Sequence, residues 1–411
     1  MGYMDGGSSP SEGSIKFAGG EFNAYDAACK AEYMDVRSNP SLSAILGNTV
    51  GVNSVRILAL KIKSLNKPRF NGMNVEALKD IANAMVEPGR GILAADESTP
   101  TIKKRFDSIN TESTEDNRRA YRQMLFTAPE MEKSISGVIM FEETLFQKSD
   151  DGTPFPELLA SKGVIPGIKV DKGAKELAGS AGEKVTEGLD GLRDRLAEYY
   201  EVGARFAKWR AVITIGDHIP SMYCLDANAH ALARYAALCQ EAGIVPIVEP
   251  EVLMDGSHSI ERCEEVTDRT LHRVFNALHL HRVCLEGIVL KPNMVLSGSE
   301  CSEQADVQTV AEATVRCLKR HVPAAVPGIA FLSGGQSDEL ATAHLDAMNK
   351  MGPLPWKLTF SYGRALQAAA LKAWGGQADN LEAGKNAFLH RAKCNGSASK
   401  GEYSTDMESA A

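Results

Sequence analysis

The sequence predicts an α/β fold, a closed eight-stranded parallel (β/α)8 barrel of the TIM type. Eight short apolar runs, each ending in a polar or charged residue, recur at spacings of roughly 30 to 45 residues. Helix-length amphipathic stretches lie between these runs, as in repeated βα units. No Pro-, Ser- or Gly-rich linker interrupts the series, which disfavours a two-domain chain.

The predicted strands are short and end in residues that can carry chemistry. Their apolar runs cover 91–95, 138–141, 167–168, 206–207 continuing to 213, 245–248, 287–290, 328–332 and 357–360. Between them, residues 229–239 and 309–318 have apolar residues at three-to-four spacing, which predicts crossover helices. The predicted barrel spans residues 73–394.

Composition excludes several classes of protein. Lys and Arg number 45 against 53 Asp and Glu, and 44% of the residues are hydrophobic, as in ordinary globular proteins. The net charge of −8 provides no global field for nucleic acid, and no apolar run is long enough to cross a membrane. We therefore expect neither nucleic-acid nor membrane partners. The eight cysteines form no CxxC pair, which favours reduced thiols and a cytoplasmic protein.

The two ends of the chain differ from this body. Residues 1–72 form an N-terminal extension whose second half, 36–72, carries six basic and no acidic residues. A disordered tail, a translation start at Met73 and a targeting segment that would direct the protein to an organelle all fit this composition. At the other end, the small polar residues of 395–411 predict a mobile tail.

The carboxyl ends of all strands in such a barrel meet at one face, so strand-end residues from distant parts of the sequence converge there. This group contains lysines and carboxylates and no cluster of histidines: Asp96, Glu142, Lys169, Lys208, Arg210, Glu249, Lys291, Ser333 and Arg364.

Lys291 is the strongest candidate nucleophile. Four apolar residues precede it and Pro292 follows, so the barrel interior would desolvate its ammonium group. Desolvation and a second cation, which Lys208 would supply, favour the neutral amine of a Schiff-base lysine. A structural ion pair with Glu249 or Asp96 is the alternative for Lys291, and a structural role is equally open for Lys208.

Asp96 and Glu249 each close an apolar strand, which suits proton transfer. Asp96 could instead cap the helix that begins near Thr99.

Two groups of residues predict anion binding. Ser333 and Gly334 follow the seventh strand and Arg364 follows the eighth, where this fold commonly holds a phosphate. Lys169 and Arg210, with Ser98 nearby, offer a second anion site on the opposite rim. A solvated rim is the alternative for these cations. Metal chemistry is not predicted, because no HxxxH or HExxH occurs and the close pair His279 and His281 lies away from the strand ends.

Nine motifs between about Met73 and Asn395 carry a resemblance to one family: PGRGILAADES, NRRAYRQMLFTAP, GVIMFEETLFQ, PGIKVDKG, GARFAKWRAV, VPIVEPEVL, EGIVLKPNMV, FLSGGQS and FSYGRALQ. Because these motifs occur in the family's order and spacing, the sequence resembles class I, Schiff-base-forming fructose-1,6-bisphosphate aldolases. The resemblance implies reversible cleavage of fructose 1,6-bisphosphate to dihydroxyacetone phosphate and glyceraldehyde 3-phosphate, in glycolysis and gluconeogenesis. It also implies a homotetramer, and it requires neither cofactor nor metal.

The resemblance assigns roles residue by residue. Lys291 would form the Schiff base, Asp96 would take the C4 hydroxyl proton, and Glu249 would act in carbinolamine dehydration beside Lys208 and Glu251. Further residues match the family's phosphate ligands: Ser333, Gly334 and Arg364 for the C1 phosphate, and Ser98, Thr101, Lys169 and Arg210 on the C6 side.

The sequence departs from the family in several features, of which Val289 in place of a usual leucine is expected to be neutral. Many members end in a tyrosine that helps to protonate the enamine, whereas this chain ends in Ala411 and its nearest candidate is Tyr403. Thr101 stands where serine is usual, and residues 1–72 have no counterpart in the common cytosolic enzymes. The absent terminal tyrosine bears on the preference for the bisphosphate over fructose 1-phosphate. A transaldolase-like Schiff-base lyase and a non-catalytic barrel scaffold are the alternative functions.

Overall fold

The computed structural model describes residues 15–17, 20–22 and 74–410. The chain divides into two units, Met1–Asn71 and Gly72–Ala411. In the first unit, β1 (Ile15–Phe17) pairs antiparallel with β2 (Gly20–Phe22). The other predictions made for residues 1–72 lie outside the described residues.

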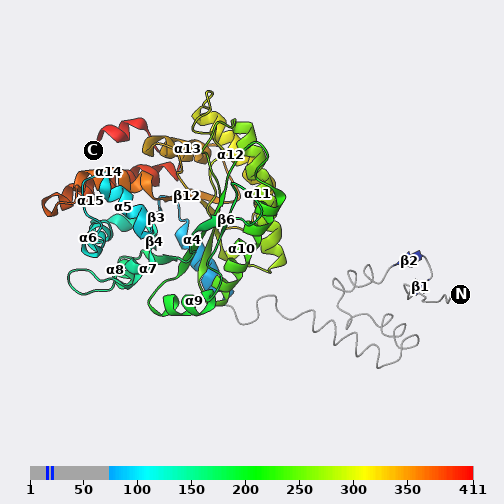
Figure 1. Cartoon of the computed structure of the whole chain (residues 1–411), viewed down its shortest axis with the longest axis horizontal. Coiled ribbons are helices and arrows are strands. Elements are labelled where there is room, and N and C mark those ends of the chain that lie inside the picture. Colours follow the sequence, from blue (N-terminus) through cyan, green and yellow to red (C-terminus); the bar gives the residue numbers. More distant parts are fainter. Residues whose placement is uncertain (1–14, 18–19, 23–73, 411) are drawn as a thin grey trace. The chain divides into compact units, whose positions relative to one another are not determined.

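The second unit is built on a closed barrel, as the sequence predicts (Figure 1). Its strands pair in parallel in the order β10-β11-β12-β3-β4-β5-β8-β9, so β12, the last barrel strand in the chain, pairs with β3, the first barrel strand. The barrel strands are β3 (Gly91–Ala95), β4 (Ile135–Met140), β5 (Ile165–Lys169), β8 (Phe206–Ile213), β9 (Val245–Val252), β10 (Val289–Leu290), β11 (Gly328–Phe331) and β12 (Lys357–Tyr362).

One of these strands extends further than its apolar run predicts. Strand β9 continues past the predicted run 245–248 to Val252, whereas β8 ends at Ile213 as predicted, and Arg210 lies opposite Glu249 in the register. Lys208, Arg210 and Glu249 therefore lie within strands rather than after them. Because alternate residues of a strand share a face, a strand can present several polar groups to the barrel interior.

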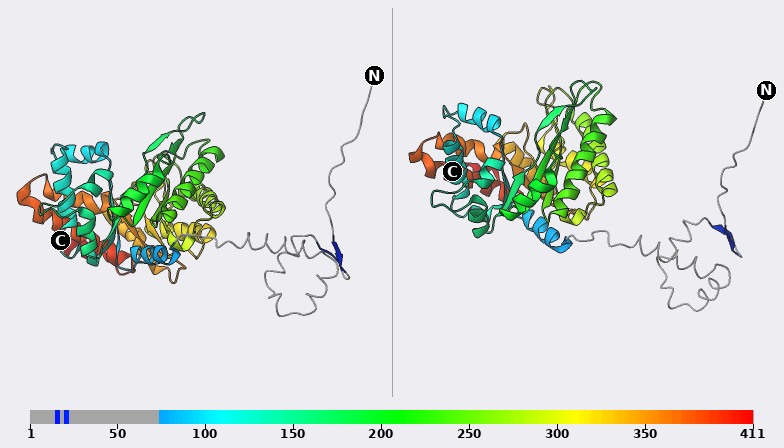
Figure 2. Two further views of the ribbon diagram at one scale, coloured as in Figure 1. Left: turned by 90° about the horizontal axis from the view of Figure 1, so that it is seen from below. Right: turned by 60° about the horizontal axis from the view of Figure 1, so that its bottom comes forward.

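Helices surround the barrel (Figure 2). The α-helices are α4 (Val75–Met85), α5 (Thr99–Asp107), α6 (Glu115–Phe126), α7 (Glu142–Phe146), α8 (Phe155–Ser161), α9 (Leu192–Glu201), α10 (Met222–Glu241), α11 (Ile260–Leu280), α12 (Val307–His321), α13 (Asp338–Lys350), α14 (Arg364–Trp374) and α15 (Leu381–Ala398). The two predicted crossover helices are confirmed, within α10 and α12.

Short elements complete the unit: the antiparallel pair β6 (Ala174–Glu176) and β7 (Lys184–Thr186), and the 3-10 turns η1 (Met131–Lys133), η2 (Leu285–Gly287), η3 (Ala378–Asn380) and η4 (Thr405–Ala410).

Side chains cap the long crossover helices where the sequence places Ser or Asp. The side chains of Ser221, Ser259, Asp306 and Ser337 each accept a hydrogen bond from a backbone N–H in the first turn of α10, α11, α12 and α13 respectively. These bonds satisfy donors that a helix start otherwise leaves unpaired, and they fix where each crossover leaves its strand.

Helix α4 closes the amino-terminal end of the barrel. Its Leu78, Ala82 and Met85 pack against buried side chains that include Phe206 and Val245, the first residues of β8 and β9. This apolar plug leaves the carboxyl ends of the strands as the open end. A functional site is expected at that open end.

Strand glycines make room for one large side chain inside the barrel. A Cβ on Gly167 would lie 2.3 Å from the ring of Phe206, and a Cβ on Gly137 would lie 3.0 Å from it. Phe206 is fully buried, so β4 and β5 can pass this close only because they carry no side chain at these positions.

The C-terminal segment differs from the prediction made for residues 395–411. Helix α15 does not end at residue 394 but continues through buried Asn395 to Ala398, and η4 follows at Thr405. Buried Tyr403 joins this segment to α13, because its backbone N–H donates to Asp346 Oδ1 at 2.9 Å. The segment is therefore packed on the barrel unit rather than leaving it at Asn395.

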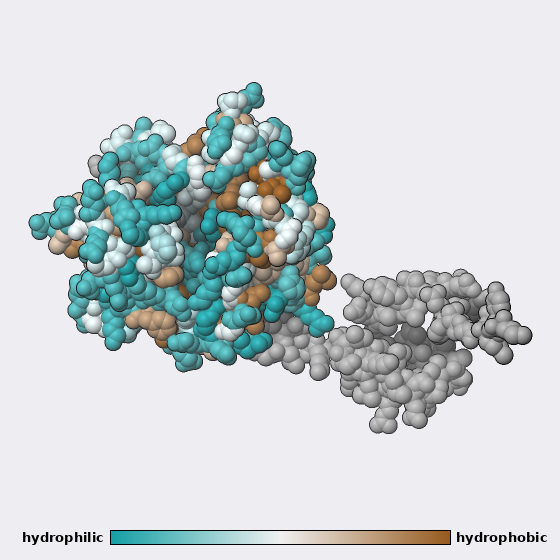
Figure 3. Space-filling view, in the orientation of Figure 1, coloured by the Kyte–Doolittle hydropathy of each residue, from teal (hydrophilic) through white to brown (hydrophobic). Residues whose placement is uncertain are grey.

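The surface of the described residues is largely polar. Figure 3 shows a mostly hydrophilic face with scattered apolar side chains. Among the described residues, exposed large apolar side chains include Tyr223 on α10 and Leu280 at the end of α11. No helix of the described part of the chain combines the length and the apolar character needed to span a bilayer.

Candidate active site

A cavity of about 840 Å³ opens at the carboxyl ends of the barrel strands. All twelve residues that the sequence predicts for the site line it: Asp96, Ser98, Thr101, Lys169, Lys208, Arg210, Glu249, Glu251, Lys291, Ser333, Gly334 and Arg364. The convergence of strand ends thus brings together residues that are up to 268 positions apart in the chain (364 − 96).

Four buried charges of alternating sign form the centre of this cavity. Lys208 Nζ lies 2.7 Å from Asp96 Oδ2 and 3.5 Å from Glu249 Oε2. The other oxygen of Glu249, Oε1, lies 3.1 Å from Lys291 Nζ. Each charge therefore has an opposite partner, which is the condition for keeping ionised groups inside a protein.

These contacts set the protonation of the cluster. Burial by itself would raise the pKa of Asp96, but the positive charges of Lys208 and Lys291 outweigh it and lower the pKa to about 2. Burial opposes the charge on Lys208, and the nearby carboxylates of Asp96 and Glu249 overcome this effect and raise its pKa. At neutral pH, Asp96 is thus an ionised carboxylate held by a protonated lysine.

The backbone around Lys291 is fixed by neighbouring elements. Its N–H donates to the carbonyl oxygen of Val248 in β9 at 2.8 Å, directly after the short strand β10. Two residues later, Asn293 Oδ1 accepts from the Val252 N–H at 3.0 Å and its Nδ2 donates to Thr267. These bonds hold the lysine at the cavity wall, with its side chain only 4% exposed.

The structure bears on the alternative roles of Lys291 and Asp96. Lys291 forms the ion pair with Glu249 that a structural role would predict, and it also lines the cavity. The ion pair and a place in the cavity are therefore compatible. Asp96 does not cap α5: the N-cap position is Ser98, and Asp96 instead contacts Lys208.

The loop after β11 brings backbone groups close to the cavity. Ser333 is buried, and Gly335 has φ of +69°, which favours glycine. A Cβ at this glycine would also collide with Met254. Arg364 begins α14 after β12, and its Nη2 donates to the carbonyl oxygen of Gln336 at 3.3 Å. Backbone N–H groups and a guanidinium at adjacent strand ends are suited to an oxyanion such as phosphate.

The opposite rim carries cations that already have carboxylate partners. Lys169 Nζ lies 2.7 Å from Asp171 Oδ1, and Arg210 pairs with Glu251. Ser98 Oγ and Thr101 Oγ1 lie 3.1 Å apart at the start of α5. These hydroxyls and cations line the same cavity and could bind a second oxyanion, provided that it competes with the two carboxylates.

Comparison with known proteins identifies the family. The model of the class I fructose-bisphosphate aldolase family matches residues 77–411. The probable fructose-bisphosphate aldolase class 1 of Xanthomonas axonopodis pv. citri is 60% identical over 332 residues, which are 80% of this chain and 99% of that protein. The chain belongs to the class I fructose-bisphosphate aldolases.

Further relatives of this aldolase come from other kingdoms. Fructose-bisphosphate aldolase 6, cytosolic, of Arabidopsis thaliana is 59% identical over 331 residues, 80% of this chain and 92% of that protein. A solved fructose-bisphosphate aldolase of Plasmodium falciparum, in complex with TRAP and a small-molecule inhibitor, is 52% identical with a TM-score of 0.79. The similarity to that structure covers 80% of this chain and 95% of the other.

Several residues of the aldolase cavity were not predicted as site residues. Arg105 lines it from α5 and pairs with buried Glu97, which also accepts from Arg122 Nη2 at 2.7 Å. In the sequence, Arg105 follows two lysines on an amphipathic helix and is indistinguishable from a solvent-exposed charge. Its role in the cavity depends on tertiary packing that no local pattern encodes.

Glu142, which was predicted to follow a strand, lines the same cavity from the start of α7. Tyr199 donates to its Oε1 at 2.5 Å and Lys172 lies 3.3 Å from its Oε2. These two contacts hold Glu142 at the rim of the cavity.

Proposed function

We propose that this chain cleaves fructose 1,6-bisphosphate reversibly through a Schiff base on Lys291. The observation that carries the proposal is the position of Lys291 Nζ, buried at the cavity wall and 3.1 Å from Glu249. A lysine in such a site can pass a proton to the carboxylate and attack a ketone as the free amine.

Schiff-base formation would use Lys291 and Glu249 together. The amine adds to the C2 carbonyl and forms the C–N bond as the C=O π bond breaks, and the proton that the nitrogen loses passes to the carbonyl oxygen to give the neutral carbinolamine. Glu249 would then donate the proton that it holds to the carbinolamine hydroxyl, which leaves as water and gives the iminium ion. Lys208, 3.5 Å from Glu249 Oε2, would stabilise the carboxylate that remains.

Bond cleavage would use Asp96. As an ionised carboxylate, Asp96 would accept the proton of the C4 hydroxyl, the C3–C4 bond would break, and the electron pair would move to the iminium nitrogen. Glyceraldehyde 3-phosphate leaves. Protonation of the enamine at C3 and hydrolysis then release dihydroxyacetone phosphate and restore Lys291.

The two rims of the cavity would bind the two phosphates. For the C1 phosphate we propose Ser333, Gly334 and Arg364, and for the C6 phosphate Ser98, Thr101, Lys169 and Arg210. A phosphate on the C6 side must share Lys169 and Arg210 with Asp171 and Glu251. We therefore propose that Glu251 positions Arg210 rather than contacting the reacting carbons.

A kinetic comparison tests this function. The wild-type chain should release triose phosphate from fructose 1,6-bisphosphate in a coupled assay with EDTA present. Lys291→Met removes the nucleophile and should lower kcat about 10⁴-fold or more. A folded wild-type chain without turnover would support the non-catalytic barrel scaffold. Turnover of transaldolase substrates alone, such as a sedoheptulose phosphate, would support another Schiff-base lyase.

The assembly is a separate proposal. We propose a homotetramer, to which exposed apolar side chains such as Tyr223 and Leu280 would contribute contact area. Sedimentation equilibrium of the wild-type chain measures this directly, and a monomer at micromolar concentration would overturn it.

For the compartment we propose the cytoplasm. The support is the cytosolic description of two Arabidopsis relatives, which are 59% and 57% identical to this chain. Fractionation of cells that express the tagged full chain tests the proposal. Recovery in an organelle, with loss of residues 1–72, would instead assign that segment a targeting role.

A further inference from the structure

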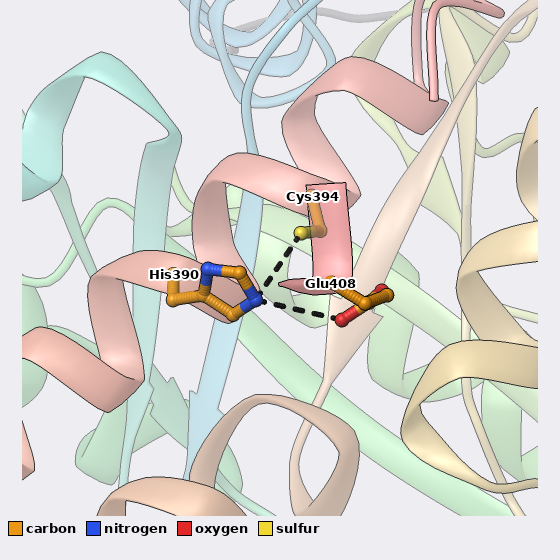
Figure 4. A group of neighbouring side chains, drawn as sticks. All are labelled: His390, Cys394 and Glu408. Carbon is orange, nitrogen blue, oxygen red and sulfur yellow. Dashed lines mark hydrogen bonds and ion pairs between the residues drawn. The ribbon is translucent and has the colours of Figure 1, made fainter. Parts of the chain in front are cut away.

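Three side chains with metal-binding atoms face one another away from the cavity (Figure 4). His390 and Cys394 lie four residues apart on α15, and Glu408 comes from η4. His390 Nε2 lies 3.8 Å from Cys394 Sγ and 3.5 Å from Glu408 Oε2, and all three donor atoms lie within 4.8 Å of one another.

Two of these separations, His–Cys and His–Glu, are close to those of a metal coordination shell. A tetrahedral ion with Zn–S of about 2.3 Å and Zn–N of about 2.0 Å places its ligand atoms roughly 3.3 to 3.7 Å apart. The His–Cys and His–Glu distances of 3.8 and 3.5 Å need little adjustment to reach this range. A nitrogen, a sulfur and a carboxylate oxygen form a donor set that suits Zn²⁺ better than Mg²⁺ or Ca²⁺.

The surroundings hold the ligands in place. Cys394 is buried, and Tyr403 OH donates to Glu408 Oε1 at 2.8 Å, which leaves Oε2 directed toward His390. A cation bound here would stabilise the thiolate form of Cys394, which is the form that binds metal.

Arg391 is the competitor for the carboxylate. Its Nη1 contacts Glu408 Oε2, but its Nη2 is held independently, by the carbonyl oxygen of Asp338 at 3.1 Å and Thr342 Oγ1 at 2.6 Å. The guanidinium can therefore keep its place in α15 while a metal shares the carboxylate. Its charge lowers the affinity of the site for a cation without removing any of the three ligands.

We propose that His390, Cys394 and Glu408 bind one Zn²⁺, which joins the C-terminal turn η4 to α15. Binding forms Zn–N, Zn–S and Zn–O bonds, and the thiol proton of Cys394 passes to solvent. A water molecule fills the fourth position. None of the three ligands lines the cavity, and the zinc proposal does not depend on the function proposed above.

The sequence pattern explains why this site was not predicted. The zinc motifs HxxxH and HExxH do not occur, and the pattern here is HxxxC on a helix with a third ligand 14 residues later (408 − 394). The small polar residues between them predicted a mobile tail, and the packing of that tail brings Glu408 to the helix.

Metal analysis of the full chain tests the proposal. After loading with zinc and dialysis against metal-free buffer, wild type should retain about one zinc per chain. Cys394→Ser and His390→Gln should each lower zinc affinity about tenfold or more, and Glu408→Gln similarly. The controls are Cys301→Ser, a more accessible thiol, and His279→Gln, which should bind zinc as wild type does.

Cobalt(II) substitution provides an independent readout that does not depend on activity. Wild type should show a thiolate-to-cobalt charge-transfer band that Cys394→Ser abolishes and Cys301→Ser retains. Zinc should slow amide hydrogen exchange in Thr405–Ala410 in wild type and not in His390→Gln. No retained zinc in wild type, or wild-type zinc content in all three ligand variants, would overturn the proposal.

Discussion

Asp96, Lys208, Glu249 and Lys291 form a chain of alternating charges whose formal sum is zero. Each is almost fully buried, so removing one of them leaves a neighbour without its partner. The same arrangement gives each residue a distinct task. The Lys208 charge keeps Asp96 ionised, while Glu249 contacts both lysines.

Asp96→Asn separates the proposed base from the proposed nucleophile. The amide cannot accept the C4 hydroxyl proton, so kcat for cleavage should fall about 10²- to 10⁴-fold. Lys291 is unchanged, and borohydride should still trap dihydroxyacetone phosphate on it. A variant that loses trapping together with cleavage, while its circular dichroism remains that of wild type, would show that Asp96 acts earlier than proposed.

Acid sensitivity should report the same residue. The folded pKa of Asp96 is about 2 against an ordinary value of 3.8, so the folded state favours the carboxylate. Its contribution is fully present above the unfolded pKa and is lost as pH falls from about 4 toward 2, in total about 2 kcal/mol.

Urea unfolding at several pH values between 7 and 3 measures this contribution. Asp96→Asn is less stable at neutral pH, and its free energy of unfolding should decline less steeply below pH 4 than that of wild type. Parallel declines for the two proteins would contradict the assigned pKa.

The sequence predicts the membership of the site better than its internal contacts. Position after a strand was enough to place Asp96 and Lys291 in the cavity, because a closed barrel brings all strand ends to one face. The partners of those residues depend on side-chain distances across the barrel. The sequence therefore left open whether Lys291 pairs with Glu249, and it gave no sign that Arg105 reaches the cavity.

At the scale of the elements, the barrel depends on where side chains are absent. Phe206 fills the interior near the closed end, and β4 and β5 pass it at Gly137 and Gly167. The apolar patterns predicted these strands without predicting which glycines were needed. That requirement comes from the neighbouring strand and not from the glycine's own segment.

Gly167→Ala should destabilise the barrel. The added methyl group would lie 2.3 Å from the Phe206 ring in a site that cannot expand easily. We expect a loss of about 1–3 kcal/mol in the free energy of unfolding, measured by urea denaturation.

A double variant identifies the cause of this loss. Phe206→Leu provides space for the methyl group, so Gly167→Ala with Phe206→Leu should be more stable than the sum of the single changes predicts, by about 1 kcal/mol. Simple additivity would mean that the cost of Gly167→Ala arises elsewhere, such as in the strand backbone.

The C-terminal helix shows where composition misleads. Residues 395–397, Asn-Gly-Ser, have the composition of a polar tail. However, Asn395 lies in α15 and accepts a hydrogen bond at 2.8 Å from Thr342 Oγ1 in α13. A Cβ on Gly396 would lie 2.6 Å from the carbonyl oxygen of Gly89, so a small residue is required there for close packing. Small polar residues thus serve a helix interface that only the tertiary structure reveals.

At the scale of the whole molecule, the closed barrel was predictable because eight similar units repeat in one order. The family model begins at residue 77, and the Xanthomonas relative is covered over 99% of its length by 332 residues of this chain. The barrel unit Gly72–Ala411 is also a compact body with its own core. We therefore expect residues 1–71 not to be needed for catalysis.

A chain that begins at Met73 should accordingly fold and leave kcat and KM for fructose 1,6-bisphosphate unchanged. The measurement compares the coupled assay and the melting temperature of the shortened and full chains. A large loss of activity with an unchanged melting temperature would assign the N-terminal segment a part in catalysis.

Borohydride reduction of the full chain with dihydroxyacetone phosphate in the presence of EDTA, followed by peptide mass mapping, shows which lysine forms the Schiff base. We expect one phosphate-bearing adduct on Lys291, and none in Lys291→Met. An adduct on Lys208 or on another lysine, or no adduct on a folded and active sample, would contradict the assignment of Lys291 as the Schiff-base residue.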